Sequence, residues 1–197
     1  METSGSSYIP YSRINGSNAD SIASKITSMI GNKLTDESLA VLMYSIDELL
    51  TNIVEHSQYK NSFILLQNYP SKHRLEFSLM DDGISIPGNF RNHHIEFEND
   101  SESLEKALNG VSTKEEDGGR GFGLKSVFKV LTMGMEGEGI IVSGRGILSS
   151  NYEEGSRDPQ RKLFHFAENA EDSTVFRGCY LAFSVRNDLS PDLYKYI

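Results

Sequence analysis

The strongest constraint on the fold is a long amphipathic segment that covers residues 35–56. Its apolar residues recur at steps of three and four, which marks one buried helix face. They are Leu39, Leu42, Met43, Ile46, Leu49, Leu50 and Ile53. Thr35 is a suitable N-cap for such a helix. Beside the apolar face runs a polar stripe, in which Glu48 and Asn52 are four residues apart and so project side by side.

Strand patterns follow this helix. Residues 62–67 form a nearly continuous apolar run, and residues 74–80 alternate apolar with polar side chains. Later strands are expected at 139–143 and 174–185, and further helices at 20–30, 101–108 and 122–131. No regular pattern covers residues 88–100. This order predicts an α/β fold, a two-layer sandwich in which a mixed sheet carries helices on one face.

The chain is expected to form a single domain over residues 1–197. Its length is sufficient for one buried core, and the sequence contains no internal repeat or low-complexity linker. Residues 1–18 are predicted to be a polar lead-in with a short strand around residues 8–14. Residues 149–172 are polar and rich in glycine and acidic residues, which predicts a loop insertion.

Composition restricts the partners that the chain can bind. A formal net charge of −9 argues against a broad nucleic-acid surface, because neutralising phosphates requires clustered lysine and arginine. No apolar run is long enough to cross a bilayer, and the N-terminus lacks the basic and apolar parts of a secretory signal. Cys179 is the single cysteine, which suits a reducing compartment. A cytoplasmic protein without direct nucleic-acid or membrane contacts is expected.

Residues 117–126, Asp-Gly-Gly-Arg-Gly-Phe-Gly-Leu-Lys-Ser, lead directly into the predicted helix at 122–131. Closely spaced glycines let backbone N–H groups approach phosphate oxygens. The segment does not fit a P-loop, because Leu124 separates the last glycine from the lysine, nor a dinucleotide fingerprint, because its alternate glycines are spaced by two. Taken alone, it is compatible with a phosphate site or with a flexible loop before a helix.

Two other segments are ambiguous when taken singly. Asp81-Asp82-Gly83 follows a strand, and Asp-Gly is a common turn pair. Alternatively, Asp81 accepts a hydrogen bond from an exocyclic amine, and Gly83 allows the close approach. Glu48 and Asn52 are either solvated residues on an amphipathic helix or a general base and a neutral oxygen ligand for Mg²⁺.

The order and spacing of the three segments resemble the histidine-kinase-like, or Bergerat-type, ATPase superfamily. This group includes gyrase B subunits, MutL-type repair proteins, heat-shock chaperones, sensor histidine kinases and bacterial anti-sigma serine kinases. The resemblance runs from about residue 35 to residue 185 and implies ATP and Mg²⁺ as cofactors. The compact chain and its Glu-Leu-Leu-Thr-Asn segment at residues 48–52 are most similar in outline to the anti-sigma serine kinases.

The resemblance implies a role for each matched position. Glu48 matches the catalytic base, Asn52 the magnesium ligand, and Asp81 with Gly83 the adenine-binding box. The lid and its phosphate-binding end correspond to Lys114, Gly119, Arg120, Gly121, Phe122, Gly123 and Leu124. Two positions depart from the pattern. Ser85 replaces the second glycine of the adenine box, which implies an altered base pocket. Cys179 replaces a threonine, and its weak thiol is expected to support Asp81 less well.

Three functions are compatible with this resemblance. The first is a protein serine kinase or slow ATPase in bacterial regulation, with a protein as partner or substrate. The second is an ATP-driven dimerising module of the MutL or chaperone type, suggested by Ser112-Thr113-Lys114 and the long segment 88–119, and it implies a homodimer. The third is a non-catalytic nucleotide sensor or scaffold, suggested by Ser85 and Cys179.

Overall fold

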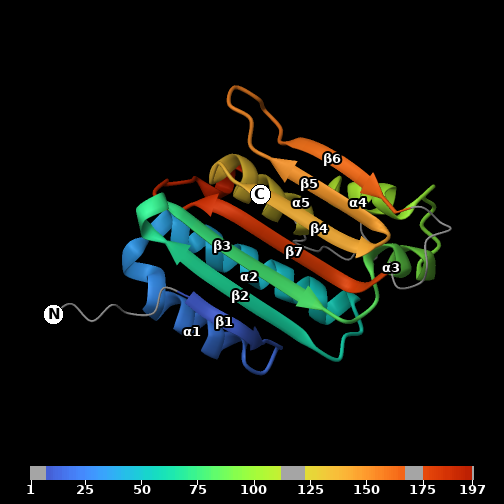
Figure 1. The fold of residues 1–197 in the computed structure, drawn as a ribbon, viewed down its shortest axis with the longest axis horizontal. Helices are drawn as coiled ribbons and strands as arrows, with labels where there is room; N and C mark the ends of the chain where they lie inside the picture. The colour runs from blue at the N-terminus through green and yellow to red at the C-terminus, as the bar shows by residue number, and fades with distance from the viewer. Residues whose placement is uncertain (1–7, 112–122, 167–174, 197) are drawn as a thin grey trace.

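A seven-stranded antiparallel sheet forms one layer of the molecule, and helices form the other (Figure 1). The computed structural model describes residues 8–111, 123–166 and 175–196. The strands are β1 Tyr8–Arg13, β2 Ser62–Tyr69, β3 Arg74–Asp81, β4 Glu138–Gly144, β5 Gly146–Asn151, β6 Gln160–His165 and β7 Phe176–Arg186. Their order is β1-β2-β3-β7-β4-β5-β6, so the last strand inserts at the centre. The expected two-layer α/β sandwich is confirmed, but its strands pair in antiparallel rather than mixed directions.

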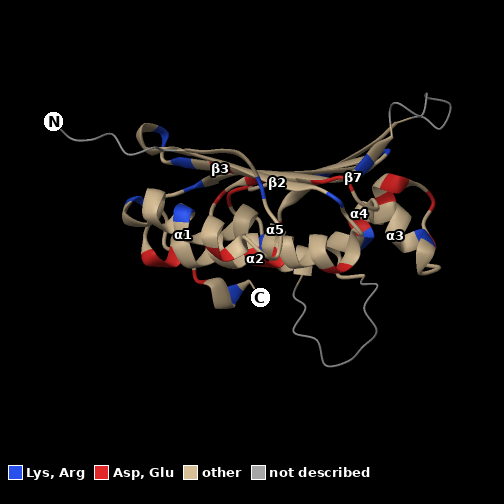
Figure 2. Cartoon of the chain, turned by 90° about the horizontal axis from the view of Figure 1, so that it is seen from below, with Lys and Arg blue, Asp and Glu red and all other residues tan. Residues whose placement is uncertain are grey.

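All the described α-helices lie on the same face of the sheet (Figure 2). They are α1 Ala19–Ile30, α2 Asp36–His56, α3 Ile86–Asn92, α4 Asp100–Leu108 and α5 Gly123–Lys129. A π-helical turn, Val130–Gly134, continues α5. No helix in the described part of the chain is both long and apolar enough to cross a membrane.

Helix α2 forms where the sequence predicts it. Thr35 is its N-cap and accepts a hydrogen bond from the Ser38 amide at 3.1 Å. The helix buries most of its apolar stripe against the sheet, including Leu42, Leu49 and Ile53. Because this face is fixed by burial, the adjacent polar stripe is held in one direction.

Aromatic side chains occupy the centre of the core. The rings of Phe77 on β3 and Phe183 on β7 stack with their centroids 5.2 Å apart, and Phe128 from α5 meets Phe183 edge-on at 4.7 Å. All three are almost completely buried. The contact between Phe128 and Phe183 fixes α5 to β7. The candidate site lies where β7 begins and its neighbour β3 ends.

Several segments differ from expectation, among them β5, because no strand is expected at residues 146–148. Within the predicted loop at 149–172, β5 extends to Asn151 and pairs with β6, so residues 160–165 are a strand. Strand β6 lies at the sheet edge and most of its side chains are exposed, so it has no alternation of buried and exposed residues to reveal it. Within residues 88–100, α3 continues to Asn92. Its Pro87-Gly88 pair is typical of turns, although proline is tolerated in the first turn of a helix.

Candidate functional site

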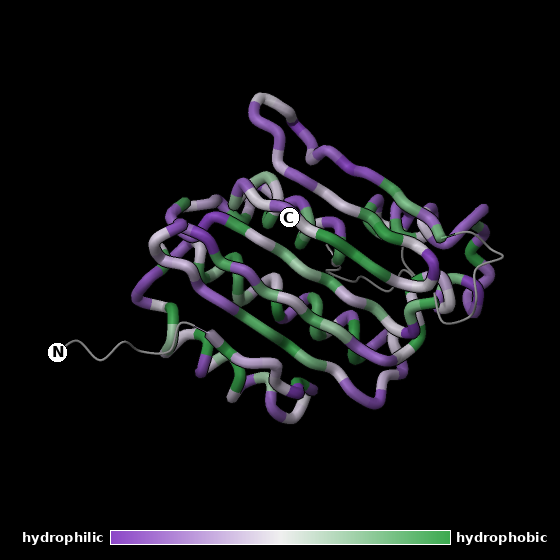
Figure 3. The backbone as a smooth tube through the Cα atoms, in the orientation of Figure 1, coloured by the Kyte–Doolittle hydropathy of each residue, from purple (hydrophilic) through white to green (hydrophobic). Residues whose placement is uncertain are grey.

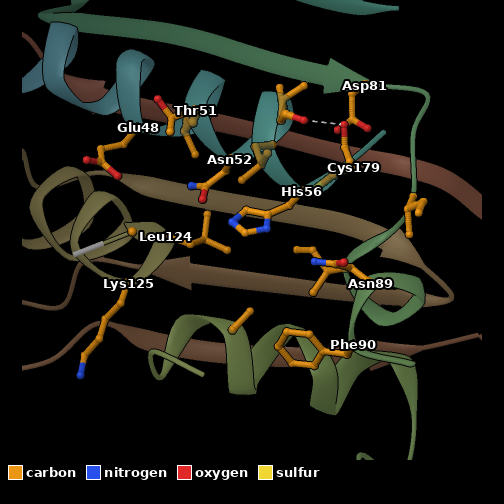
Figure 4. Close-up of a pocket in the computed structure, with 18 of the residues that line it drawn as sticks. Glu48, Thr51, Asn52, His56, Asp81, Asn89, Phe90, Leu124, Lys125 and Cys179 are labelled. Atoms are coloured by element: carbon orange, nitrogen blue, oxygen red, sulfur yellow. Dashed lines mark hydrogen bonds between the residues drawn. The ribbon is translucent and has the colours of Figure 1, made fainter. Parts of the chain in front are cut away.

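A pocket opens where β3 ends and β7 begins, between α2 and the other helices (Figure 4). Its walls come from α2, both strands, α3, the end of α4 and the start of α5. The polar and charged residues that line it are Glu48, Thr51, Asn52, His56, Ser57, Asp81, Asn89 and Lys125. Apolar side chains such as Ile84, Phe90 and Leu181 supply much of the rest. Such an apolar cavity with a few convergent polar groups is typical of small-molecule sites.

Helix α2 places three polar side chains along the pocket. Glu48, Asn52 and His56 follow one another at steps of four residues, and all three line the cavity. Figure 4 shows Glu48 and Asp81 at opposite ends, with Asn52 between them. The side-chain nitrogen of Asn52 is buried and has no hydrogen-bond partner among the described residues. A buried amide without a partner is costly unless a ligand satisfies it.

Asp81 forms the polar end of the pocket. It is the last residue of β3 and only 2% exposed. Burial raises the pKa of Asp81 from 3.8 to about 6, although hydrogen bonds from Gly83, Ser57 and Cys179 oppose that rise. The Gly83 amide donates to its Oδ1 at 2.8 Å. Above pH 6 the group is therefore a buried carboxylate that can accept a further hydrogen bond from an amine.

Two glycines bring the backbone against Asp81. A Cβ atom at Gly83 would lie 2.0 Å from the Ser57 carbonyl oxygen, which accepts a hydrogen bond from the Ile84 amide. A Cβ atom at Gly178 would lie 2.0 Å from the Asp81 carbonyl oxygen, and Gly178 has a φ of +87°. No other residue fits at either position without a shift of the backbone. At Gly83 the close neighbour is the Ser57 backbone, and the expected close approach of a bound base remains a prediction.

Cys179 lies directly across from Asp81 in the pairing of β3 with β7. Its thiol is buried, and burial together with the neighbouring Asp81 carboxylate raises the pKa of Cys179 above its ordinary value. Ser143 on β4 is its partner on the other side. The Ser143 hydroxyl donates to the Gly178 carbonyl at 2.6 Å and accepts from the Ile86 amide at 3.0 Å. A neutral thiol therefore lies beside Asp81, at the position where the resemblance implies a threonine.

The resemblance places Ser85 in the adenine box, but in the structure its side chain caps a helix. It is the N-cap of α3, and its hydroxyl accepts a hydrogen bond from the Gly88 amide at 3.1 Å. It is not among the residues that line the pocket. A serine here satisfies a first-turn amide of α3, so its effect on the pocket is to orient the helix that carries Asn89 and Phe90.

The glycine-rich segment is described only at its end. Gly123 and Leu124 start α5 and line the pocket, and Lys125 follows at its edge. The other residues predicted for this segment lie outside the described residues. They are Lys114, Gly119, Arg120, Gly121 and Phe122.

Sequence reasoning missed several lining residues, among them His56, Asn89 and Phe90. His56 continues the spacing of Glu48 and Asn52 by one further turn, so the same helical pattern would have identified it. Asn89 and Phe90 come from α3, and no sequence pattern places them in the site. The described residues contain no group of three histidine, cysteine, aspartate or glutamate side chains that could hold a metal ion. A cation bound by Asn52 would therefore need oxygen ligands from a bound molecule as well.

Comparison with known proteins identifies the family. No curated protein matches the chain. A family described as histidine kinase-, DNA gyrase B- and HSP90-like ATPase matches residues 39–176. This range begins in α2 and ends at the start of β7, so it includes Glu48, Asn52 and Asp81, and it implies that the protein binds ATP. The chain therefore belongs to the histidine kinase-, DNA gyrase B- and HSP90-like ATPases.

Proposed function

We propose that the chain binds ATP with magnesium in this pocket and transfers the γ-phosphoryl group to a serine hydroxyl of a protein partner, or slowly to water when no partner is bound. The observation that carries the proposal is the arrangement along one cavity of a buried carboxylate, a half-buried amide and a second carboxylate. These are Asp81, Asn52 and Glu48. Family membership supports ATP as the nucleotide.

The adenine base fits the end of the pocket at Asp81. There the carboxylate accepts a hydrogen bond from the exocyclic amine, and Ile84, Phe90 and Leu181 offer apolar surface to the ring. Because the site is buried, any acceptor position of the carboxylate that finds no donor is costly, and a matched amine is favoured. This selects a base that carries an amine donor over one that carries a carbonyl oxygen at the same position.

The phosphates extend along α2 toward Glu48. Asn52 has the amide oxygen needed to hold a magnesium ion, which prefers oxygen ligands. Its buried nitrogen has no partner among the described residues, and as a donor it suits a phosphate oxygen. When bound, Mg²⁺ would neutralise part of the charge that develops on the phosphate oxygens.

Glu48 lies at the other end of the pocket from Asp81 and is half-buried. Its negative charge acts on Tyr44, one turn earlier on α2. Burial first, and Glu48 second, raise the pKa of Tyr44 to about 12. In the proposed reaction, Glu48 accepts the proton of the serine hydroxyl while the serine oxygen bonds to the γ-phosphorus. The bond from phosphorus to the β–γ bridging oxygen breaks, and ADP leaves.

Substitution of the two α2 residues separates binding from transfer. In calorimetric titration with ATP, Asn52→Ala is expected to lose most of the gain in affinity that Mg²⁺ provides. Glu48→Gln is expected to bind ATP within about threefold of wild type but to transfer phosphate roughly a hundredfold more slowly, because it loses the base. Asp47→Asn, a change at an exposed neighbour on α2, serves as the control.

Labelled ATP then distinguishes the acceptors. Transfer of the γ-phosphate to a serine of an added protein supports the kinase, whereas release of inorganic phosphate alone restricts the function to ATP hydrolysis. No binding at millimolar ATP would overturn the whole proposal. The dimerising alternative was suggested by residues 112–114 and the segment 88–119, of which residues 112–119 lie outside the described residues.

A further inference from the structure

The face of the sheet that carries no helix has an apolar band across it. Residues that pair across neighbouring strands form one continuous row: Phe63, Met80, Tyr180, Val142, Ile147 and Phe164. On β1 the residue that pairs with Phe63 is Arg13, and Tyr11, two residues away, extends the apolar row because its ring stacks on Phe63 with the centroids 4.5 Å apart. Each of the seven strands thus contributes one side chain, and we call this row the apolar band.

The alternation of the strands assigns the band to the uncovered side. The next residue along each central strand is buried beneath the helices, as with Ile64, Leu79 and Leu181. Successive residues of a strand point to opposite faces, so the band points away from the helices. Figure 2 shows that no described helix lies over this side of the sheet. In Figure 3, apolar stretches of the central strands lie side by side, whereas the tip of the β5–β6 hairpin is polar.

The ends of the band are open to solvent. Tyr11 and Phe164 are each 54% exposed. With a strand spacing of about 4.8 Å, the band extends over about 29 Å. Soluble proteins seldom expose a continuous apolar surface of this extent without a partner for it.

A pair of acidic side chains borders this surface. Glu76 and Glu138 both pair with Ser184, and they lie two same-face rows from the band, a distance of about 14 Å. Both are exposed, and neither forms an ion pair with a described basic side chain. A groove on the same face includes both glutamates, together with Leu65, Ile140, Tyr180 and Ala182.

We propose that this face is the docking surface for a protein partner that presents an amphipathic helix, apolar on one side and basic along the adjacent edge. An α-helix is about 10–12 Å wide and about 30 Å long over 20 residues. Laid along the band, such a helix covers the band and the row beside it. Its lysine or arginine side chains then reach Glu76 and Glu138.

Charge favours this occupant over a second copy of the chain. A second copy would bring the same two glutamates and a net charge of −9 to the interface. Like charges across an interface oppose association. The same face also carries Arg13, which pairs with Phe63, and Lys162, which pairs with Ser149, but these lie on the two edge strands. The described lining of the groove contains both glutamates and no lysine or arginine. A basic helix therefore supplies the charge that the groove lacks, and its apolar side contacts the band.

The test uses two labelled synthetic helices of about 20 residues with the same leucine stripe, one with lysine and one with glutamate beside it. Fluorescence anisotropy with the full chain, without nucleotide, measures the binding. The leucine–lysine helix is expected to bind at least tenfold more tightly than the leucine–glutamate helix, and more weakly at high salt. The measurement does not depend on the ATP site, so its result is independent of the proposed function.

Matched variants locate the contact. Glu76→Lys with Glu138→Lys is expected to weaken binding of the leucine–lysine helix about tenfold. Glu96→Lys with Glu98→Lys makes the same change of charge at exposed residues between α3 and α4, and is expected to alter binding less than about threefold. Phe164→Ser, at one exposed end of the band, is expected to weaken binding without lowering the melting temperature. Tyr11→Ser, at the other end, is expected to weaken binding with a small loss of stability, because it also removes the ring contact with Phe63.

Three results would overturn the proposal. The first is equal binding of both helices. The second is equal weakening by the two lysine pairs. The third is a concentration-dependent dimer in sedimentation experiments that Phe164→Ser dissociates, since the occupant would then be a second copy.

Discussion

Asp81 combines a cost in stability with a role in binding. Its carboxyl titrates at 3.8 in an ordinary environment but at about 6 in the fold, and burial is the main cause. The folded chain therefore holds this proton more tightly than the unfolded chain, and stability falls as the pH rises from about 4 to about 6. Above pH 6 the ionised group lowers the free energy of unfolding, because each pKa unit corresponds to about 1.4 kcal/mol.

Asp81→Asn is expected to raise the free energy of unfolding at pH 7.5 by about 1–3 kcal/mol and to leave it nearly unchanged at pH 4. Urea denaturation at both pH values measures this. The same variant is expected to lose most of its affinity for ATP, because an amide does not replace the carboxylate as acceptor for the amine. Wild-type affinity for ATP should itself fall as the pH is lowered through about 6, where Asp81 becomes protonated.

Asp82 provides the matched control. Hydrogen bonds from Asn61 and Lys60 lower the pKa of Asp82 to about 2. Its contribution to stability is therefore present above pH 4 and is lost as the pH falls toward 2. Asp82→Asn should thus destabilise the protein at pH 7.5, opposite in sign to Asp81→Asn. Changes of the same sign in both variants would contradict the assignment of the buried carboxylate.

At the scale of the element, the entry into β7 depends on Gly178. Gly178→Ala combines a positive φ with a Cβ only 2.0 Å from the Asp81 carbonyl oxygen. We expect it to lower the free energy of unfolding by about 3 kcal/mol or more, of which about 1–2 kcal/mol is backbone strain. Gly155→Ala has a similar φ of +80° but no atom within 4 Å of its Cβ, so it isolates the strain. Equal losses in thermal denaturation would show that the contact with Asp81 is unimportant.

The same scale explains which elements the sequence could predict. Helix α2 and strand β3 each carry a complete periodic pattern, because one of their faces is buried. Strand β6 has mostly exposed side chains, and the proline and glycine of α3 obscure its pattern. The site residues divide in the same way, into those that a local sequence pattern reveals and those that it does not. Glu48, Asn52 and Asp81 lie in local motifs, whereas Asn89 and Phe90 reach the pocket only through the packing of α3.

At the scale of the whole molecule, the sandwich connects the site to global stability. The pocket is built from α2, the two central strands and three further helices, so a ligand bound there contacts elements that separate on unfolding. Binding to the folded state alone stabilises it by about 2.7 kcal/mol when the free ligand exceeds its Kd about a hundredfold.

For a chain of this length, magnesium with ATP at that concentration should raise the melting temperature by about 5–10 °C. Differential scanning fluorimetry measures the shift. Asn52→Ala should reduce it and Asp81→Asn should abolish it, whereas Phe164→Ser, on the opposite face of the sheet, should leave it unchanged. A shift that survives Asp81→Asn would mean that the nucleotide binds elsewhere on the molecule. Because the pocket and the apolar band lie on opposite sides of one sheet, the Phe164→Ser result also shows whether the two surfaces act independently.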